Sequence, residues 1–353
     1  MHSRSPAKAA KVTRAADGAK MARLANVPTR VIRPVFVVLA IGCCGYALAA
    51  RWTETRRALA DISWPVTGLA LLAALAGMWA LMLGLRAVLI GFGSAVPMRG
   101  AIRIWFISQL GKYLPGKVWA LAAQVDLGRE YRVGRKRMVS AMLLAMAMTV
   151  ATGLAVAAVT LPLTSPAATA DYWWLFPLAP VLLAALHPRV VTWALNLALR
   201  LVRRPALERP PTLAATLRAL GWNMVAWVLF GLHMWLLAAA AGGSGSSLPF
   251  AATGAYALAW TVGFVVFIAP GGIGAREAAL TIALSPALPA GAPLVVALVS
   301  RVLFTLVDLI GAGTALLLGG PPRRTGVPDR QRSAMAKAEA EAEAEAKARA
   351  KAP

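Results

Sequence analysis

Acidic residues and cysteines are scarce in this chain of 353 residues. It carries 14 Asp+Glu against 37 Lys+Arg, a formal net charge of +23. Its two cysteines, Cys43 and Cys44, are adjacent within an apolar run, so they cannot join distant segments and match no metal-ligand spacing. No nucleophile-elbow sequence, metal cluster or carboxylate dyad stands out either. The sequence therefore predicts no disulfide framework, no metal, no cofactor and no catalytic residue.

Basic residues are in excess, and their positions are explained better by the orientation of membrane spans than by nucleic-acid binding. In a soluble protein such an excess would make nucleic acid a serious partner. Here the basic residues gather in 4–33, 99–137 and 189–218 and just after the last apolar run, at Arg323 and Arg324. The positive-inside rule places such segments in the cytoplasm. We predict a multi-pass protein of the bacterial plasma (inner) membrane, with both termini cytoplasmic and no nucleic-acid partner.

Long apolar runs are the chain's main feature, and they set the fold class. Hydrophobic residues make up 59% of the sequence, in Leu/Ala/Val runs near the length of about 20 residues that crosses a bilayer core. Such runs satisfy their backbone hydrogen bonds as helices, whereas a barrel needs alternating strands. The sequence predicts an all-α polytopic membrane bundle of about six full spans plus two Gly/Pro-broken re-entrant segments. The spans are expected at about 34–50, 66–90, 138–161, 172–186, 221–241 and 294–318.

Composition also divides the chain into three parts. Residues 1–32 form a basic cytoplasmic tail, 33–320 a transmembrane domain, and 321–353 a low-complexity Ala/Glu/Lys cytoplasmic tail without an apolar face. The transmembrane domain is expected to consist of two halves, about 33–188 and 219–320, joined by an amphipathic connector at 189–218.

The first broken segment, residues 107–119, reads ISQLGKYLPGKVW. Its helix-breaking residues are Gly111, Pro115 and Gly116. Irregular backbone at membrane depth persists only where protein buries it or where it lines a wet cavity, so a charged break predicts a polar path. The flanking pieces 101–110 and 118–125 are each too short to span, which favours a re-entrant hairpin from the cytoplasm.

The charged residues of this first break allow two interpretations. In one, Lys112 and Lys117, with Tyr113 between them, bind an anionic lipid headgroup; in the other, the lysines only reach the membrane interface. The spacing G-x-x-x-x-G-K also fits a phosphate loop. However, Val118 replaces the Ser/Thr that would hold Mg²⁺ and no strand precedes it, so nucleotide hydrolysis is not predicted.

The second broken segment, residues 267–277, reads FIAPGGIGARE. A glycine turn followed by a helix start leaves unpaired N–H groups beside Arg276, a good bidentate phosphate ligand. The alternative is a flexible hinge with Arg276 and Glu277 at an interface. A re-entrant pair at 251–269 and 275–284 keeps the final basic residues inside, an arrangement resembling the inverted repeats of transporters. The breaking residues are Pro270, Gly271, Gly272 and Gly274.

Two charges interrupt the last apolar run, Arg301 and Asp308. They fall near one helical face, but two turns apart, too far to bond each other. Burying an unpaired charge in hydrocarbon is costly, so each needs another partner. The predicted partners are Arg276, Glu277 or Lys117, in either a transport site or a purely structural network. Structural roles, including hydrogen bonds between helices, are expected for the remaining polar residues, Gln109, Gln124, Asn223 and His233.

The two segments QLGKYLPGKVW (109–119) and PGGIGARE (270–277) together resemble the transmembrane, flippase-like domain of lysylphosphatidylglycerol synthases, over roughly 33–320. In two-domain members of that family, a cytosolic domain transfers lysine from aminoacyl-tRNA to phosphatidylglycerol and the membrane domain moves the product across the bilayer. This chain ends soon after its last predicted span. We therefore expect a stand-alone member without the aminoacyl-transfer domain, and synthase activity is not carried over.

The resemblance implies translocation of a lipid or a lipid-linked sugar. We expect a non-enzymatic carrier of an anionic or aminoacylated phospholipid, or of a polyprenyl-phosphate precursor, through a cavity between the broken segments. Lys112, Lys117 and Arg276 would neutralise phosphate, while Glu277 and Asp308 would balance them or meet a cationic headgroup. The alternative is a membrane-embedded transferase, or an accessory subunit for envelope assembly that binds a separate synthase or glycosyltransferase. The oligomeric state is left open.

Overall fold

A computed structural model of the chain describes residues 63–113, 118–187, 189–190, 192–193, 196–197, 211–265 and 274–318. The predicted basic tail, the first span, most of the connector and the C-terminal tail lie outside these ranges. Chain contacts separate a unit of residues 1–318 from a unit of residues 319–353, and all the described residues belong to the first.

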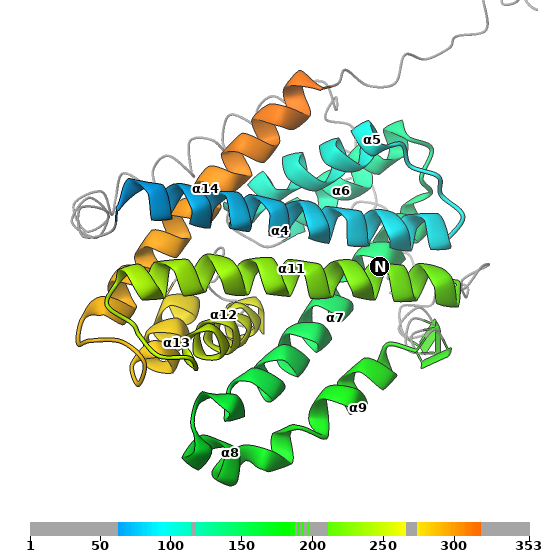
Figure 1. Ribbon diagram of the computed structural model, residues 1–353. Helices are drawn as coiled ribbons and strands as arrows, with labels where there is room; N and C mark the ends of the chain where they lie inside the picture. The colour runs from blue at the N-terminus through cyan, green and yellow to red at the C-terminus, as the bar shows by residue number, and fades with distance from the viewer. Residues whose placement is uncertain are drawn as a thin grey trace, which may run out of the picture. The chain divides into compact units, whose positions relative to one another are not determined.

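Every regular element in these ranges is a helix (Figure 1). The α-helices are α4 (Trp64–Gly91), α5 (Met98–Ile102), α6 (Val118–Glu130), α7 (Arg135–Thr160), α8 (Pro166–Tyr172), α9 (Leu178–Ala185), α11 (Leu213–Ala240), α12 (Leu248–Val265), α13 (Ala275–Leu284) and α14 (Ala292–Leu317). Shorter turns are the π-helix η1 (Arg103–Ile107) and the 3₁₀ helices η2 (Leu110–Tyr113), η3 (Pro162–Thr164) and η4 (Trp173–Leu175). This confirms the predicted all-α class.

Four of the described helices are long and apolar enough to cross a membrane. They are α4, α7 with its continuation through η3, α11 and α14. Each extends over a predicted span, at 66–90, 138–161, 221–241 and 294–318 respectively. The chain is an all-α polytopic membrane bundle.

The fourth predicted span, at 172–186, differs from the structure. This segment is divided into η4 and the eight-residue helix α9. Pro177 lies between them, and its missing N–H and fixed φ interrupt the hydrogen-bond ladder there. Alone, α9 is too short to cross a bilayer.

The fifth predicted span begins earlier than expected. Helix α11 starts at Leu213 rather than near Gly221. The Thr212 hydroxyl accepts a hydrogen bond from the Ala215 N–H at 3.3 Å and caps the helix, which fixes its start. The last residues of the predicted connector are therefore helical.

Helices α4 and α11 run side by side (Figure 1). Glycines 77, 84 and 91 of α4 recur every seventh residue and face α11. A Cβ added at Gly91 would lie 2.6 Å from the Cβ of Ala215, and one added at Gly77 would strike the Phe230 ring. Small residues permit this close approach of two membrane helices.

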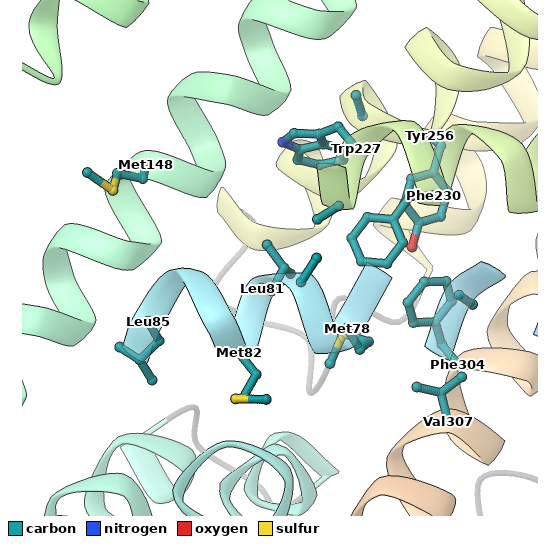
Figure 2. Packing of buried hydrophobic residues seen from close by; sticks show 14 of the residues in the cluster. Met78, Leu81, Met82, Leu85, Met148, Trp227, Phe230, Tyr256, Phe304 and Val307 are labelled. Carbon is teal, nitrogen blue, oxygen red and sulfur yellow. The ribbon is translucent and has the colours of Figure 1, made fainter. Parts of the chain in front are cut away.

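An aromatic cluster joins α11, α12 and α14 (Figure 2). Phe230 lies 5.4 Å from Phe304, ring centroid to centroid, and Phe304 stacks on Tyr256 at 5.7 Å. Trp227 meets Tyr256 edge-on at 6.4 Å. Such contacts add to simple area burial. The cluster thereby holds the middle of α14, which carries both charges of the last span.

Candidate functional site

A cavity of about 270 Å³ opens among the helices of the bundle. Its lining comes from both predicted broken segments and from α4, α6, α7, α11, α12 and α14. Its charged lining residues in the described ranges are Lys112, Arg276 and Arg301. Its uncharged polar lining includes Ser108, Gln109, Tyr113, Gln124, Thr149, Asn223 and Thr305. The two segments singled out from the sequence thus meet at one site.

The first broken segment departs from α-helical geometry before its proline. After α5 the chain forms the π-helix η1 and then the 3₁₀ helix η2, which carries Gly111, Lys112 and Tyr113. Such changes of helix type often mark functional sites. Gln124 of α6 donates to the Ser108 hydroxyl at 2.9 Å, which ties the two legs of the predicted hairpin together. Residues 115–117, with the predicted site residue Lys117, lie outside the described ranges.

An ion pair also joins the two helical pieces on either side of the first break. Arg103 of η1 lies 3.6 Å from Glu130 at the end of α6, nitrogen to oxygen. Tyr131 follows Glu130, and burial raises the pKa of its hydroxyl above the ordinary value. Arg103, Glu130 and Tyr131 do not line the cavity, so this network holds η1 and α6 together rather than forming the site.

Asp308 of α14 is bound by the first broken segment. Its Oδ2 atom lies 2.6 Å from the Lys112 Nζ and accepts a hydrogen bond from the Tyr113 hydroxyl at 2.6 Å. The Asp308 side chain has no solvent exposure, whereas that of Lys112 is 32% exposed. The prediction that Asp308 needs a partner other than Arg301 is confirmed. That partner is Lys112, which the proposed network of Arg276, Glu277 and Lys117 did not include.

Arg301 is bound by the second broken segment. Its guanidinium forms an ion pair with Glu277, as predicted. The other Glu277 oxygen accepts the Gly274 N–H at 2.7 Å. Gly274 has φ 87°, which favours glycine, and it precedes the first residue of α13. One N–H expected to be free at this helix start is therefore satisfied by Glu277, while Pro270, Gly271 and Gly272 lie outside the described ranges.

Arg276 is held differently from the other two cations. Its Nη2 donates to the Tyr256 hydroxyl at 3.0 Å, and its guanidinium lies 5.0 Å and 5.1 Å from the ring centroids of Tyr256 and Phe304. No carboxylate pairs with it in the described ranges. A Cβ added at Gly263 would lie 2.9 Å from the Arg276 Cβ, so this glycine allows α12 and α13 to approach. Aromatic contacts and one hydroxyl therefore position Arg276.

The carboxylates that bind the lining cations do not line the cavity themselves. Asp308 and Glu277 are buried and, unlike Lys112 and Arg301, which they bind, are not among the lining residues. Both acidic groups thus balance protein cations. The Oδ1 atom of Asp308 is buried and has no hydrogen-bond partner among the described residues. The expectation that the carboxylates could meet a cationic headgroup stays a prediction.

The rest of the cavity lining is apolar or carries uncharged hydroxyl and carboxamide groups. Asn223 of α11 accepts from the Thr149 hydroxyl of α7 at 3.0 Å, an interhelical bond of the kind predicted for it and for Gln124. Gln109 was expected to do the same, but its amide has no hydrogen-bond partner in the described ranges. His233 bridges the Ala70 carbonyl and the Ser300 hydroxyl, each at 3.0 Å, in a structural role. Four methionines also line the cavity, at positions 78, 142, 146 and 148.

Tyr256 and Phe304, which hold Arg276, are site residues that sequence reasoning missed. Both are buried aromatic residues in apolar helices, and nothing in their spacing distinguishes them from ordinary core residues. Their role under Arg276 follows only from the packing of three helices. Among the described residues there is also no group of three His, Cys, Asp or Glu side chains that could hold a metal ion.

The model of a known protein family matches residues 31–312, and its description is the lysylphosphatidylglycerol synthase TM region. The match includes most of the chain and both broken segments. The chain belongs to this family. As a member of the lysylphosphatidylglycerol synthase TM region family, it is a multi-pass integral membrane protein of lipid metabolism. A comparison with curated proteins finds no similar sequence.

Proposed function

We propose that this protein is a non-enzymatic carrier that translocates a phosphate-bearing lipid across the bacterial plasma membrane. The observation that carries the proposal is the meeting of the two broken segments at one cavity, to which Lys112 comes from the first and Arg276 from the second. The lipid headgroup enters this cavity, and the lipid phosphate binds the cations on its wall.

The chemistry of the wall suits a phosphate ester. A guanidinium offers paired donors that match phosphate oxygens, and an ammonium adds a compact charge. Arg301 contributes the third lining cation. It lies about 14 Å along α14 from the first residue, at a rise of 1.5 Å per residue, well inside the length of that apolar helix. This position of Arg301 supports the proposal, because a headgroup that crosses the bilayer needs charge compensation within the apolar region.

The size and the apolar lining of the cavity favour binding of the lipid headgroup, with the acyl chains outside. At about 270 Å³, the cavity is just below the range of roughly 300–1,000 Å³ typical of small-molecule sites. The cavity suits a headgroup rather than a whole lipid, so the acyl chains stay against the lining methionines or in the bilayer. Methionine side chains adapt readily to irregular apolar partners. No complete nucleotide-binding motif accompanies the cavity in the sequence, so we expect downhill movement or coupling to an ion gradient or a partner.

A reconstitution experiment tests the proposal. The purified chain is placed in vesicles of phosphatidylcholine containing a trace of fluorescent phosphatidylglycerol, and the fraction reached by a membrane-impermeant quencher is followed over time. We expect faster loss of the protected fraction than in protein-free vesicles. Arg276→Gln abolishes the acceleration because the phosphate loses a bound cation.

The matched control is Arg218→Gln, which removes an exposed arginine of α11 that does not line the cavity. This variant keeps the wild-type rate. Thermal unfolding in detergent checks that both variants are folded. A wild-type rate equal to that of protein-free vesicles, or a folded Arg276→Gln variant as fast as wild type, would contradict the proposal.

A further inference from the structure

Asp308 is a buried carboxylate of which only one oxygen atom has a partner. Its side chain has no solvent exposure, and it belongs to α14, a helix long and apolar enough to cross a membrane. Its Oδ2 atom binds both the Lys112 Nζ and the Tyr113 hydroxyl, each at 2.6 Å. Its Oδ1 atom is buried and has no hydrogen-bond partner among the described residues. Buried polar atoms are nearly always hydrogen-bonded, so this oxygen requires an explanation.

We infer that Asp308 is a proton-binding site and that lipid movement through the cavity is coupled to proton movement. A proton from water binds the Oδ1 atom, Asp308 becomes neutral, and the Lys112 ammonium is released to bind the lipid phosphate. At the opposite face of the membrane, Asp308 returns the proton to water, Lys112 pairs with the carboxylate again, and the phosphate leaves. One proton thus accompanies each lipid in the same direction. This inference rests on the proposed function and gives it an energy source.

The charges of the pair make proton binding and phosphate binding depend on each other. Lys112 lines the cavity and its side chain is 32% exposed, so it is the partner that can turn toward a headgroup. If it left an ionised Asp308, a fully buried charge would remain unpaired, which is strongly unfavourable. A proton on Asp308 removes that charge, and a phosphate then replaces the carboxylate as the partner of Lys112. Each ligand therefore favours the other, and this coupling is reciprocal.

The carboxylate is close enough to the cavity to exchange a proton with water there. Lys112, Tyr113 and Thr305 line the cavity, whereas Asp308 does not. The Tyr113 hydroxyl lies 2.6 Å from the Asp308 Oδ2 atom and 3.4 Å from the Thr305 hydroxyl. Hydroxyl groups both donate and accept hydrogen bonds, so they can join the carboxylate to cavity water. Ionisable residues within membrane helices commonly belong to such proton relays.

Glu277, the other carboxylate that binds a lining cation, is not placed to do the same. One of its oxygens accepts from Arg301 and the other from the Gly274 N–H. A proton on either oxygen would displace one of these bonds, whereas the Oδ1 atom of Asp308 loses none. The two ion pairs of α14 therefore differ, and only the one with Asp308 has an oxygen open to a proton.

Other charged or titratable groups on the elements packed against α14 are bound elsewhere or exposed. Arg86 of α4 donates to the Val96 carbonyl at 3.0 Å. Arg103 of η1 binds Glu130, His233 of α11 binds Ala70 and Ser300, and Arg276 of α13 contacts Tyr256 of α12. Arg99 of α5 and Arg218 of α11 are exposed. Lys117 of the first break lies outside the described ranges. Among the described residues, the Asp308 carboxylate is thus contacted by Lys112 and Tyr113 alone.

A pH gradient across reconstituted vesicles tests the inference. Vesicles of phosphatidylcholine with a trace of fluorescent phosphatidylglycerol are made about two pH units more acidic outside than inside, and the fraction reached by a membrane-impermeant quencher is measured once it is constant. One proton per lipid sets an upper limit of about hundredfold accumulation on the alkaline side. We expect at least threefold enrichment in the inner leaflet relative to vesicles without a gradient. Reversing the gradient reverses the enrichment, and a protonophore abolishes it. Protein-free vesicles under the same gradient are the control.

Two variants locate the proton. Asp308→Asn is permanently neutral, so a folded variant moves lipid without responding to the gradient, whereas the exposed-site control Arg218→Gln responds as the wild type does. If Asp308→Asn does not fold, Lys112→Met replaces it, because this change removes the cation that the proton displaces and so also abolishes the response.

The outcomes separate the two proposals. A wild type that moves lipid equally with and without a gradient overturns this inference alone, and so does a response that persists in the folded Asp308→Asn or Lys112→Met variant. A wild type that moves no lipid under any condition overturns the transport proposal itself.

Discussion

The Nζ atom of Lys112 and the Oδ2 atom of Asp308 lie 2.6 Å apart, so one ion pair joins the first broken segment to the last span. The two residues are far apart in the sequence, and the carboxylate has no solvent exposure. A second pair, Arg301 with Glu277, joins the same span to the second broken segment. Helix α14 is thus the common support of both breaks, and its charges fix their positions at the cavity.

The first prediction concerns the Lys112–Asp308 pair. Asp308→Asn leaves a partly buried ammonium without its carboxylate, and we expect the free energy of unfolding to fall by about 3 kcal/mol. Replacing both partners by apolar residues, as in Lys112→Met with Asp308→Leu, recovers most of that loss. A double-mutant cycle built from Lys112→Met, Asp308→Leu and the two together, measured by reversible unfolding in detergent, gives the coupling. Additive effects of the two single changes would show that the pair contributes nothing.

The second prediction concerns the turn before α13. Gly274 has φ 87°, and no atom of the described residues lies within 4 Å of a Cβ added there. Gly274→Ala therefore acts through the backbone alone and lowers the free energy of unfolding by about 1–2 kcal/mol. The control is Gly313→Ala in α14, where a Cβ also meets nothing, and the change is neutral or stabilising because alanine favours a helix. Equal effects of the two substitutions would contradict this account.

The third prediction concerns the contact between α4 and α11. A Cβ at Gly77 strikes the Phe230 ring, which belongs to the aromatic cluster. Gly77→Ala is expected to lower the free energy of unfolding by about 1–3 kcal/mol through overpacking. Gly68→Ala in the same helix is the control, because a Cβ there meets no atom of the described residues within 4 Å. Thermal unfolding of the two variants checks the difference, and a Gly77→Ala variant as stable as the control would be the contrary result.

The fourth prediction concerns the support of Arg276. Tyr256→Phe removes the hydroxyl that accepts from Arg276 at 3.0 Å but keeps the ring beneath the guanidinium. We expect phosphatidylglycerol retention in nanodiscs, measured by native mass spectrometry, to fall about threefold to tenfold, within the net contribution of about 0.5–1.5 kcal/mol for a typical hydrogen bond. Phe304→Leu removes the second ring and tests the cation–π part separately. If neither variant changes retention while both remain folded, Arg276 does not depend on this support.

Much of the fold was predictable from the sequence because a bilayer imposes a strict rule. Backbone N–H and C=O groups in hydrocarbon must form hydrogen bonds within their own segment. An apolar run of sufficient length therefore predicts a helix directly. The runs at 66–90 and 294–318 correspond to α4 (Trp64–Gly91) and α14 (Ala292–Leu317). The failure at 172–186 has a local cause, since Pro177 divides that run although its composition is apolar throughout.

The sequence by itself also determined where charge interrupts apolar helices, and therefore which residues needed partners. The spacing of Arg301 and Asp308 on one helix excluded a bond between them, but spacing says nothing about residues on other helices. Only the tertiary structure decided that Lys112 binds Asp308, that Glu277 binds Arg301, and that Arg276 rests on Tyr256 and Phe304. The reason is physical: helix formation is a local property of the chain, whereas charge pairing depends on which distant segments the packed core brings within a few ångströms.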